Sequence, residues 1–193
     1  MLRCMVAPAA TSQRILDVAE RLVQTRGYNG FSYADIASAL KVTKASLHYH
    51  FPAKSDLGKE LIERYERNFL VALEAIDAGA KDAPSKLRRY AALFEGVLRG
   101  DRMCLCGMLA AEWGTLPRPM RDPMRHFFDE NEKWLVKVLQ EGKKEKTLRF
   151  PGTAASAAQT LLGALEGAMM IARSYGDVGR FTAVADRVLA DLS

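Results

Sequence analysis

Apolar residues recur every three or four positions along most of this chain, a spacing that places them on one face of an α-helix. Alternation of apolar and polar residues, which would indicate β-strands, is hardly seen. Within residues 11–26, one helical face holds only aliphatic side chains: Ile15, Val18, Ala19, Leu22 and Val23. Gly27 follows, and glycine commonly ends a helix. The pattern predicts an all-α chain whose first helix covers residues 11–26.

Glycine, proline and charged turns divide the rest of the chain into further helices, and about nine are expected in all. The later ones are expected between Ser32 and Lys41, between Thr43 and Pro52, over 54–78, from Pro84 to Arg99, over 103–113, between Pro117 and Lys143, over 153–174 and over 179–192. No internal repeat or low-complexity segment stands out in this succession.

The most informative stretch is residues 32–52, where two short helices flank a tight turn. Ser32 is a good N-cap for the first helix, and Asp35 three residues later completes a motif close to a capping box. Thr43 can cap the second helix, and Pro52 stops it. This is the layout of a helix-turn-helix, whose second helix enters the major groove of DNA.

The second of these short helices carries many polar side chains away from its apolar face. Leu47 and Phe51, four residues apart, anchor it inward. The other faces hold Lys44, Ser46, His48 and His50. A surface hairpin with solvated side chains is the alternative, but so many aromatic and histidine residues are unusual on a surface that binds nothing.

The stretch Val42–Leu57, VTKASLHYHFPAKSDL, resembles the signature of the tetracycline-repressor (TetR) family, which is close to V-S/T-K-G/A-S/T-L-Y-Y/H-H-F-x-S/N-K-E-x-L. The resemblance is specific because the positions agree without a gap, and it covers mainly the first 60 residues. Three positions depart from the pattern. Lys41 replaces a frequent turn glycine, His48 replaces a frequent tyrosine, and Ala53 replaces a Ser/Asn cap.

The resemblance implies which residues contact DNA. They are Ser32, Thr43, Lys44, Ala45, Ser46, His48, Tyr49, His50 and Lys54. Thr43 and Tyr49 would mostly contact phosphates, which position the protein without reading sequence. Lys44 is long enough to reach a guanine edge or a phosphate. Lys54 would add a phosphate contact at the start of the fourth helix.

Positive charge is denser in the first part of the chain. Residues 1–56 hold 7 Lys and Arg against 4 Asp and Glu, a net charge of +3, whereas the whole chain carries +5. The remaining 137 residues therefore supply only +2. Contacts to DNA phosphates need such a concentration of charge. The uneven distribution of charge supports the DNA-binding interpretation of residues 32–52.

The sequence indicates neither secretion nor membrane insertion. Met1–Ala10 lacks the apolar core of a signal peptide. The longest uncharged stretch, residues 150–165, is too short and too rich in small side chains to span a bilayer before it meets Glu166. Three cysteines, an odd number, argue against a disulfide framework. We therefore expect a cytoplasmic protein.

We expect a DNA-binding domain over residues 1–56 and a ligand-binding and dimerisation domain over residues 57–193, with no linker between them. The resemblance implies that the second domain binds a small-molecule effector. Aromatic and methionine side chains make adaptable apolar cavity walls, although at helical spacing they are more often plain core. The candidates are Tyr90, Phe94, Met108, Trp113, Phe127, Phe128, Met169 and Met170.

Cys104 and Cys106 lie two residues apart in a predicted helix, so their side chains would point about 200° apart and only one could face a cavity. The segment is similar to the Gly-Cys-Leu…Glu segment of TetR regulators that sense electrophiles and aldehydes, with Met103 in place of the glycine. A helix start can lower the pKa of a thiol. Cys104 is therefore a further candidate effector-site residue, and an inert buried cysteine is the alternative.

The helix expected over 153–174 is apolar nearly all round and rich in small side chains. Such a helix is buried, and in so small a domain a partner subunit is the natural cover. The expected homodimer interface comprises Ala158, Leu161, Leu162, Leu165, Val184 and Val188. An intramolecular core is the alternative.

We interpret the chain as a homodimeric repressor that leaves a near-palindromic operator in double-stranded DNA when a small molecule binds. One alternative is a thiol-based electrophile or redox sensor triggered at Cys104. A remoter one is an α-helical enzyme or small-molecule carrier, for which no paired carboxylates, Ser/His/Asp arrangement or metal-ligand spacing is evident. No catalytic residue, metal or cofactor is expected.

Overall fold

The computed structural model describes residues 8–192. Within that range the chain forms nine helices and no strand: α1 (Pro8–Arg26), α2 (Tyr33–Leu40), α3 (Lys44–His50), α4 (Lys54–Gly79), α5 (Ala83–Arg99), α6 (Leu105–Ala111), α7 (Arg118–Lys144), α8 (Ala154–Tyr175) and α9 (Val178–Ala190). The predicted all-α architecture is confirmed. The expectation about a signal peptide in Met1–Ala10 falls mostly outside the described residues.

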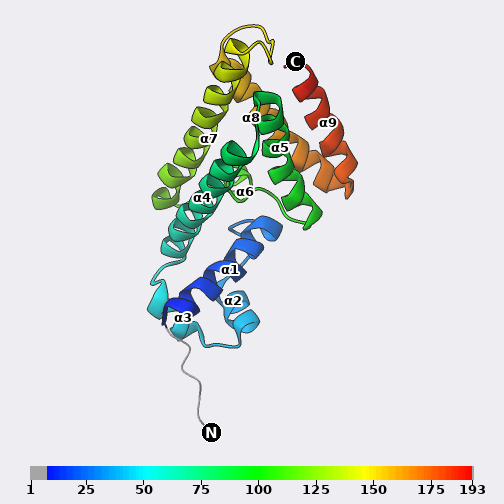
Figure 1. The fold of residues 1–193 in the computed structure, drawn as a ribbon. Coiled ribbons are helices and arrows are strands. Elements are labelled where there is room, and N and C mark those ends of the chain that lie inside the picture. The colour runs from blue at the N-terminus through cyan, green and yellow to red at the C-terminus, as the bar shows by residue number, and fades with distance from the viewer. Residues whose placement is uncertain (1–7, 193) are drawn as a thin grey trace.

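The helices form two groups (Figure 1). The head, α1 to α3, lies at one end of the molecule, and the body, α5 to α9, lies at the other. The long helix α4 runs from the head into the body. None of the helices in the described range is long and apolar enough to cross a membrane.

Local capping explains why the two short helices of the head begin where the sequence predicts. The Ser32 hydroxyl accepts a hydrogen bond from the amide of Ala34, while Asp35 accepts one from the amide of Ser32, which is a capping box. The Thr43 hydroxyl accepts a hydrogen bond of 3.3 Å from the amide of Ser46. Lys41 makes the turn between them with a left-handed φ of 55°, the conformation for which glycine is the usual residue.

The head is held together by apolar side chains from its three helices and by α4. Ile15, Ile36 and Leu47 are fully buried, so the inward face predicted for α3 is confirmed. The Tyr33 hydroxyl donates a hydrogen bond of 2.8 Å to the carbonyl of Phe51, which fixes the end of α3. These contacts leave the opposite face of α3 outside the core.

The helix α4 belongs to both groups. In the head, Arg64 forms ion pairs of 2.6 Å with both Asp17 and Glu20 of α1. Farther along, Leu73 and Ile76 of α4 are buried in the body. The helix α4 is continuous from Lys54 to Gly79, so no break in it marks where the head ends and the body begins. The domain boundary expected at residue 56 therefore stays a prediction.

The body is built around stacked and edge-to-face aromatic rings. Phe69 of α4 lies 5.3–6.1 Å from the rings of Tyr90, Phe94 and Phe127. Tyr90 is fully buried, and its hydroxyl donates a hydrogen bond of 2.9 Å to Asn131. Aromatic pairs of this kind stabilise a core beyond their burial alone. The helix α8 packs against α5, α7 and α9 around this core.

The helix α6 is shorter than the predicted range 103–113. Its N-cap is Cys104, and the chain before it is tied to the head, where the Met103 amide donates to the carbonyl of Gln24 at 3.0 Å. At the other end, Glu112 leaves the helix in a tighter turn, with its amide bonded to the carbonyl of Leu109. Contacts with the head therefore limit α6 at both ends.

Candidate nucleic-acid interface and effector pocket

The outer face of α3 is exposed. Tyr49 is 79% exposed, and Lys44, Ala45 and His48 are also exposed. The helix lies at the far end of the head from the body (Figure 1). A short helix with its inner face buried and its outer face free has the geometry of a recognition helix.

His48, which departs from the family pattern, is partly held by its neighbours. Its Nδ1 atom lies 3.1 Å from the carbonyl oxygen of Pro52, and its ring centroid is 4.8 Å from that of Tyr33. His50 packs edge-on against Tyr49 with a centroid distance of 5.2 Å. These contacts limit the orientations of both histidine rings.

Lys54 is expected to contact a DNA phosphate, but its ammonium group points into the head. Its Nζ atom donates hydrogen bonds to the carbonyls of Tyr28 and Phe31 and lies 4.4 Å and 4.1 Å from the centroids of their rings. Burial lowers the pKa of this ammonium group. Ser32 is similarly occupied, since its hydroxyl donates to Asp35 at 2.7 Å. In this arrangement both residues stabilise the head, and their contacts with DNA stay a prediction.

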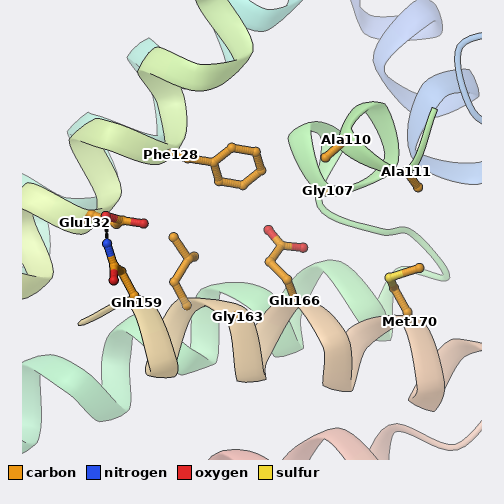
Figure 2. A pocket seen from close by; sticks show the side chains of 10 residues that line it. Gly107, Ala110, Ala111, Phe128, Glu132, Gln159, Gly163, Glu166 and Met170 are labelled. Atoms are coloured by element: carbon orange, nitrogen blue, oxygen red, sulfur yellow. Dashed lines mark hydrogen bonds between the residues drawn. The ribbon is translucent and has the colours of Figure 1, made fainter. Parts of the chain in front are cut away.

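The body contains a pocket of about 500 Å³ between α6, α7 and α8, called here the α6–α7–α8 pocket (Figure 2). Its wall is formed by Gly107, Ala110, Ala111, Phe128, Glu132, Gln159, Leu162, Gly163, Glu166 and Met170. This size is within the range typical of small-molecule sites. Figure 2 shows the Phe128 ring and the Glu166 carboxylate entering the same space from opposite helices.

Only two of the predicted effector residues, Phe128 and Met170, line this pocket. The others do not, because most of them fill the closed core: Tyr90, Phe94, Cys104, Phe127 and Met169 are buried. Met108 and Trp113 are half-buried outside the pocket wall, where Trp113 stacks with Arg121 and Arg125. Large aromatic side chains pack on one another and so remove the space that they were expected to enclose.

The residues that create the space are not among the predicted effector residues. Gly107, Ala110, Ala111 and Gly163 have side chains too small to fill it. In the sequence, Glu166 marks the end of an uncharged stretch. A single acid that interrupts an otherwise apolar helix was the signal that could have identified it, since a buried charge needs a reason.

Glu166 is the most unusual polar group of the body. Both of its carboxylate oxygens are buried, and neither has a hydrogen-bond partner of good geometry in the described residues. Burial raises the pKa of this carboxyl to about 7, an effect that the nearby Cys104 thiol partly offsets. Residue 107 of α6 is glycine, and a methyl group there would collide with Oε2 of Glu166.

Cys104 does not have the environment of a reactive thiol. Cys104 and Cys106 are both buried and free, and neither of them lines the α6–α7–α8 pocket. Burial and the neighbouring Glu166 raise the pKa of Cys104 well above its ordinary value, whereas the thiol-sensor alternative requires a lowered pKa. Desolvation outweighs the helix start because the thiol lies among apolar and acidic groups. The geometry does not favour the thiol-sensor alternative.

Two side chains of the body hold the head near the end of α1. The Glu112 carboxylate accepts hydrogen bonds from the amides of Tyr28, at 2.6 Å, and Asn29, at 3.2 Å. Arg173 of α8 donates two hydrogen bonds of 2.8 Å to the carbonyls of Gln24 and Thr25. Elements that line the α6–α7–α8 pocket are thus bonded directly to the head.

The residues predicted for a homodimer interface mostly serve the core of the single chain. Ala158, Leu161, Leu162 and Leu165 are buried against α5, α7 and α9. Val188 is half-buried, and only Val184 is exposed. An all-round apolar pattern could not separate the side of α8 that packs within the chain from the side that remains open. The open side carries the exposed apolar residues Met170, Ile171 and Tyr175.

A helix-turn-helix head, joined through a continuous helix to a helical body with a pocket, defines a DNA-binding regulator with a sensor domain. The comparisons give the particular family. Residues 15–61 match the model of bacterial regulatory proteins of the tetR family, and residues 83–188 match the tetracyclin repressor-like C-terminal domain. The chain belongs to the TetR family, whose members bind operator DNA.

Similar proteins cover almost the whole chain. A TetR-family regulator from Agrobacterium tumefaciens is 32% identical, with a TM-score of 0.93 over 96% of this chain and 99% of that one. A TetR regulator from Legionella pneumophila is also 32% identical, with a TM-score of 0.87 over 95% and 97%. The HTH-type transcriptional repressor DhaR of Mycobacterium sp. (strain GP1) is 24% identical over 95% of this chain and 94% of its own.

Proposed function

We propose that this chain is a homodimeric repressor, located in the cytoplasm, that releases its operator when a small molecule enters the α6–α7–α8 pocket. The observation that carries the proposal is the exposed face of α3, with Lys44 and Tyr49 projecting from a helix whose inner side chain, Leu47, is fully buried. The likeness to DhaR, a repressor by its name, supports repression over activation.

Base and phosphate contacts are assigned to different residues of α3. Lys44 and Ser46 lie in its first turn, where a recognition helix contacts base edges, and exposed His48 lies on the next turn. Thr43 and Tyr49 flank this surface and would contact phosphates. Ala45 is exposed and small, which permits close approach to a thymine methyl group.

A second copy of the chain would cover the open side of α8 and the adjoining face of α9. Met170, Ile171 and Tyr175 on α8 and Val184 on α9 are large apolar side chains exposed in the single chain. Two heads related by a two-fold axis would read a near-palindrome. Light scattering should give a dimer, and Ile171→Glu should shift it to monomer and weaken operator binding.

The DNA assignment is tested with an operator selected from genomic DNA. We expect Lys44→Ala combined with Tyr49→Phe to abolish the gel shift, while circular dichroism and the melting temperature stay as in the wild type. Lys81→Ala, which removes an exposed lysine from the body, is the matched control and should bind normally. Unchanged affinity of the double variant for the operator would remove α3 from the interface.

A further inference from the structure

The buried Glu166 carboxylate has no counter-charge in the fold. Neither oxygen has a hydrogen-bond partner of good geometry among the described residues, the neutral Cys104 thiol is its polar neighbour, and no lysine, arginine or histidine lines the pocket beside it. A buried charge without a partner is strongly unfavourable, so proteins seldom retain one unless something binds it. Glu166 therefore calls for a positively charged or hydrogen-bond-donating occupant.

The other ionisable group of the pocket wall also favours a positively charged ligand. Glu132 is the second ionisable residue of the wall, and its carboxylate accepts a hydrogen bond of 3.3 Å from Gln159. Both ionisable residues of the wall are therefore acids. An anion entering this space would be repelled, whereas a cation would be attracted.

The rest of the pocket wall suits the apolar part of a ligand. Phe128, Leu162 and Met170 supply large apolar surfaces, and the glycines and alanines of α6 and α8 leave room beside them. Phe128 projects from α7 across the space from Glu166 (Figure 2). An aromatic face near a cation adds favourable electrostatic energy to the apolar contact.

We propose that the effector is an apolar molecule with one protonated nitrogen, and that its ammonium group pairs with the carboxylate of Glu166. This inference rests on the proposed function, because it names the class of ligand for the same pocket. Gly107 covers the carboxylate on the α6 side. An ammonium group can therefore make full contact with the carboxylate once α6 moves away from α8. Such a movement would act on the head, because the Glu112 contact with the head follows directly after α6.

The test uses three probes with the same phenylbutyl body and different ends: 4-phenylbutylammonium, 4-phenylbutan-1-ol and 5-phenylpentanoate. Calorimetry on the full chain at about pH 8 keeps the amine protonated. We expect the ammonium probe to bind at least about tenfold more tightly than the alcohol. The carboxylate probe should bind most weakly. Glu166→Gln should remove the advantage of the ammonium probe and leave the affinity for the alcohol unchanged.

Asp129→Asn is the matched control, because it removes a negative charge from the exposed side of α7 outside the pocket wall. It should leave all three affinities unchanged. Equal affinities for ammonium and alcohol, no ammonium binding at millimolar concentration, or an unaffected ammonium affinity in Glu166→Gln would each overturn the inference.

The same protein is assayed in parallel for operator binding, so the two proposals fail separately. Operator binding together with release by the alcohol as readily as by the ammonium probe would overturn the ligand class and leave the repressor function standing. Absence of operator binding in the wild type would instead contradict the proposed function.

Discussion

The carboxylate of Glu112, at the end of α6, accepts a hydrogen bond of 2.6 Å from the backbone amide of Tyr28 in the head. The same carboxylate also accepts from the amide and the side chain of Asn29. These bonds join residues more than 80 positions apart. The loop between α1 and α2 is thus held by a helix whose earlier residues form the pocket wall.

Glu112→Gln should weaken this junction, because a carboxamide has one acceptor oxygen and presents its own N–H donors to the amides of Tyr28 and Asn29. We expect the free energy of unfolding to fall by about 1–2 kcal/mol. Hydrogen exchange should show faster exchange of the Tyr28 amide. Glu74→Gln, at an exposed position of α4, should change neither quantity, and unchanged protection of Tyr28 in Glu112→Gln would contradict the assignment.

Lys54→Met should act on the stability of the head. The variant loses two charge-assisted hydrogen bonds to the carbonyls of Tyr28 and Phe31, so unfolding should become easier by about 2–3 kcal/mol. The slope of the logarithm of operator affinity against the logarithm of salt concentration should stay unchanged. The loss of a phosphate contact would instead lower the magnitude of that slope by about one. A reduced slope with normal stability would restore the phosphate role that the sequence suggested. Lys59→Met, at an exposed position, controls for the loss of charge.

Glu166→Gln should stabilise the protein at neutral and higher pH. The pKa of Glu166 is about 7 in the folded protein and 4.5 ordinarily, so the folded state binds the extra proton between these values. Wild-type stability therefore falls as the pH rises from about 4.5 to about 7, by roughly 3 kcal/mol relative to the variant. The facing groups Tyr65, Tyr90, Cys104 and Cys106 have raised pKa values and stay neutral there. Urea unfolding across this range measures the difference, and a constant difference would refute the burial of the charge.

Cys104 should be inert in the folded protein. Its thiol is buried and its pKa is raised, so the reactive thiolate is scarce near neutral pH. Iodoacetamide followed by peptide mass spectrometry should leave Cys104 unmodified in buffer and alkylated in urea. Cys104→Ser should respond to the effector like the wild type. Rapid alkylation of the native protein would favour the thiol-sensor alternative.

The fold was largely predictable because its signals are local. The hydroxyls of Ser32 and Thr43 and the carboxylate of Asp35 act within a few residues of their own positions, so their capping roles follow from spacing. The order of the helices follows in the same way from glycine, proline and apolar periodicity. The family signature likewise lies within one continuous segment.

The site was only partly predictable, because its geometry depends on distant contacts. Whether Lys54 faces solvent depends on where Tyr28 and Phe31 place their carbonyls, which no local pattern encodes. Leu161 and Leu165 would be apolar whether they packed within the chain or against a partner. The pocket arises from missing volume at Gly107 and Gly163, and a search for large apolar side chains selects against such positions.

The helix α6 spans Leu105 to Ala111, with Gly107 at the pocket and the Glu112 junction directly after its end. So short a helix gives natural selection little freedom to change one end alone. A substitution that broadened the range of accepted compounds at Ala110 or Ala111 would also disturb the hold on the head. Relatives whose ligand specificity changed by this route would also show a changed level of basal transcription from the promoters that they control. Redesign of this protein as a biosensor is therefore better begun on the α7 wall, at Phe128 or Glu132.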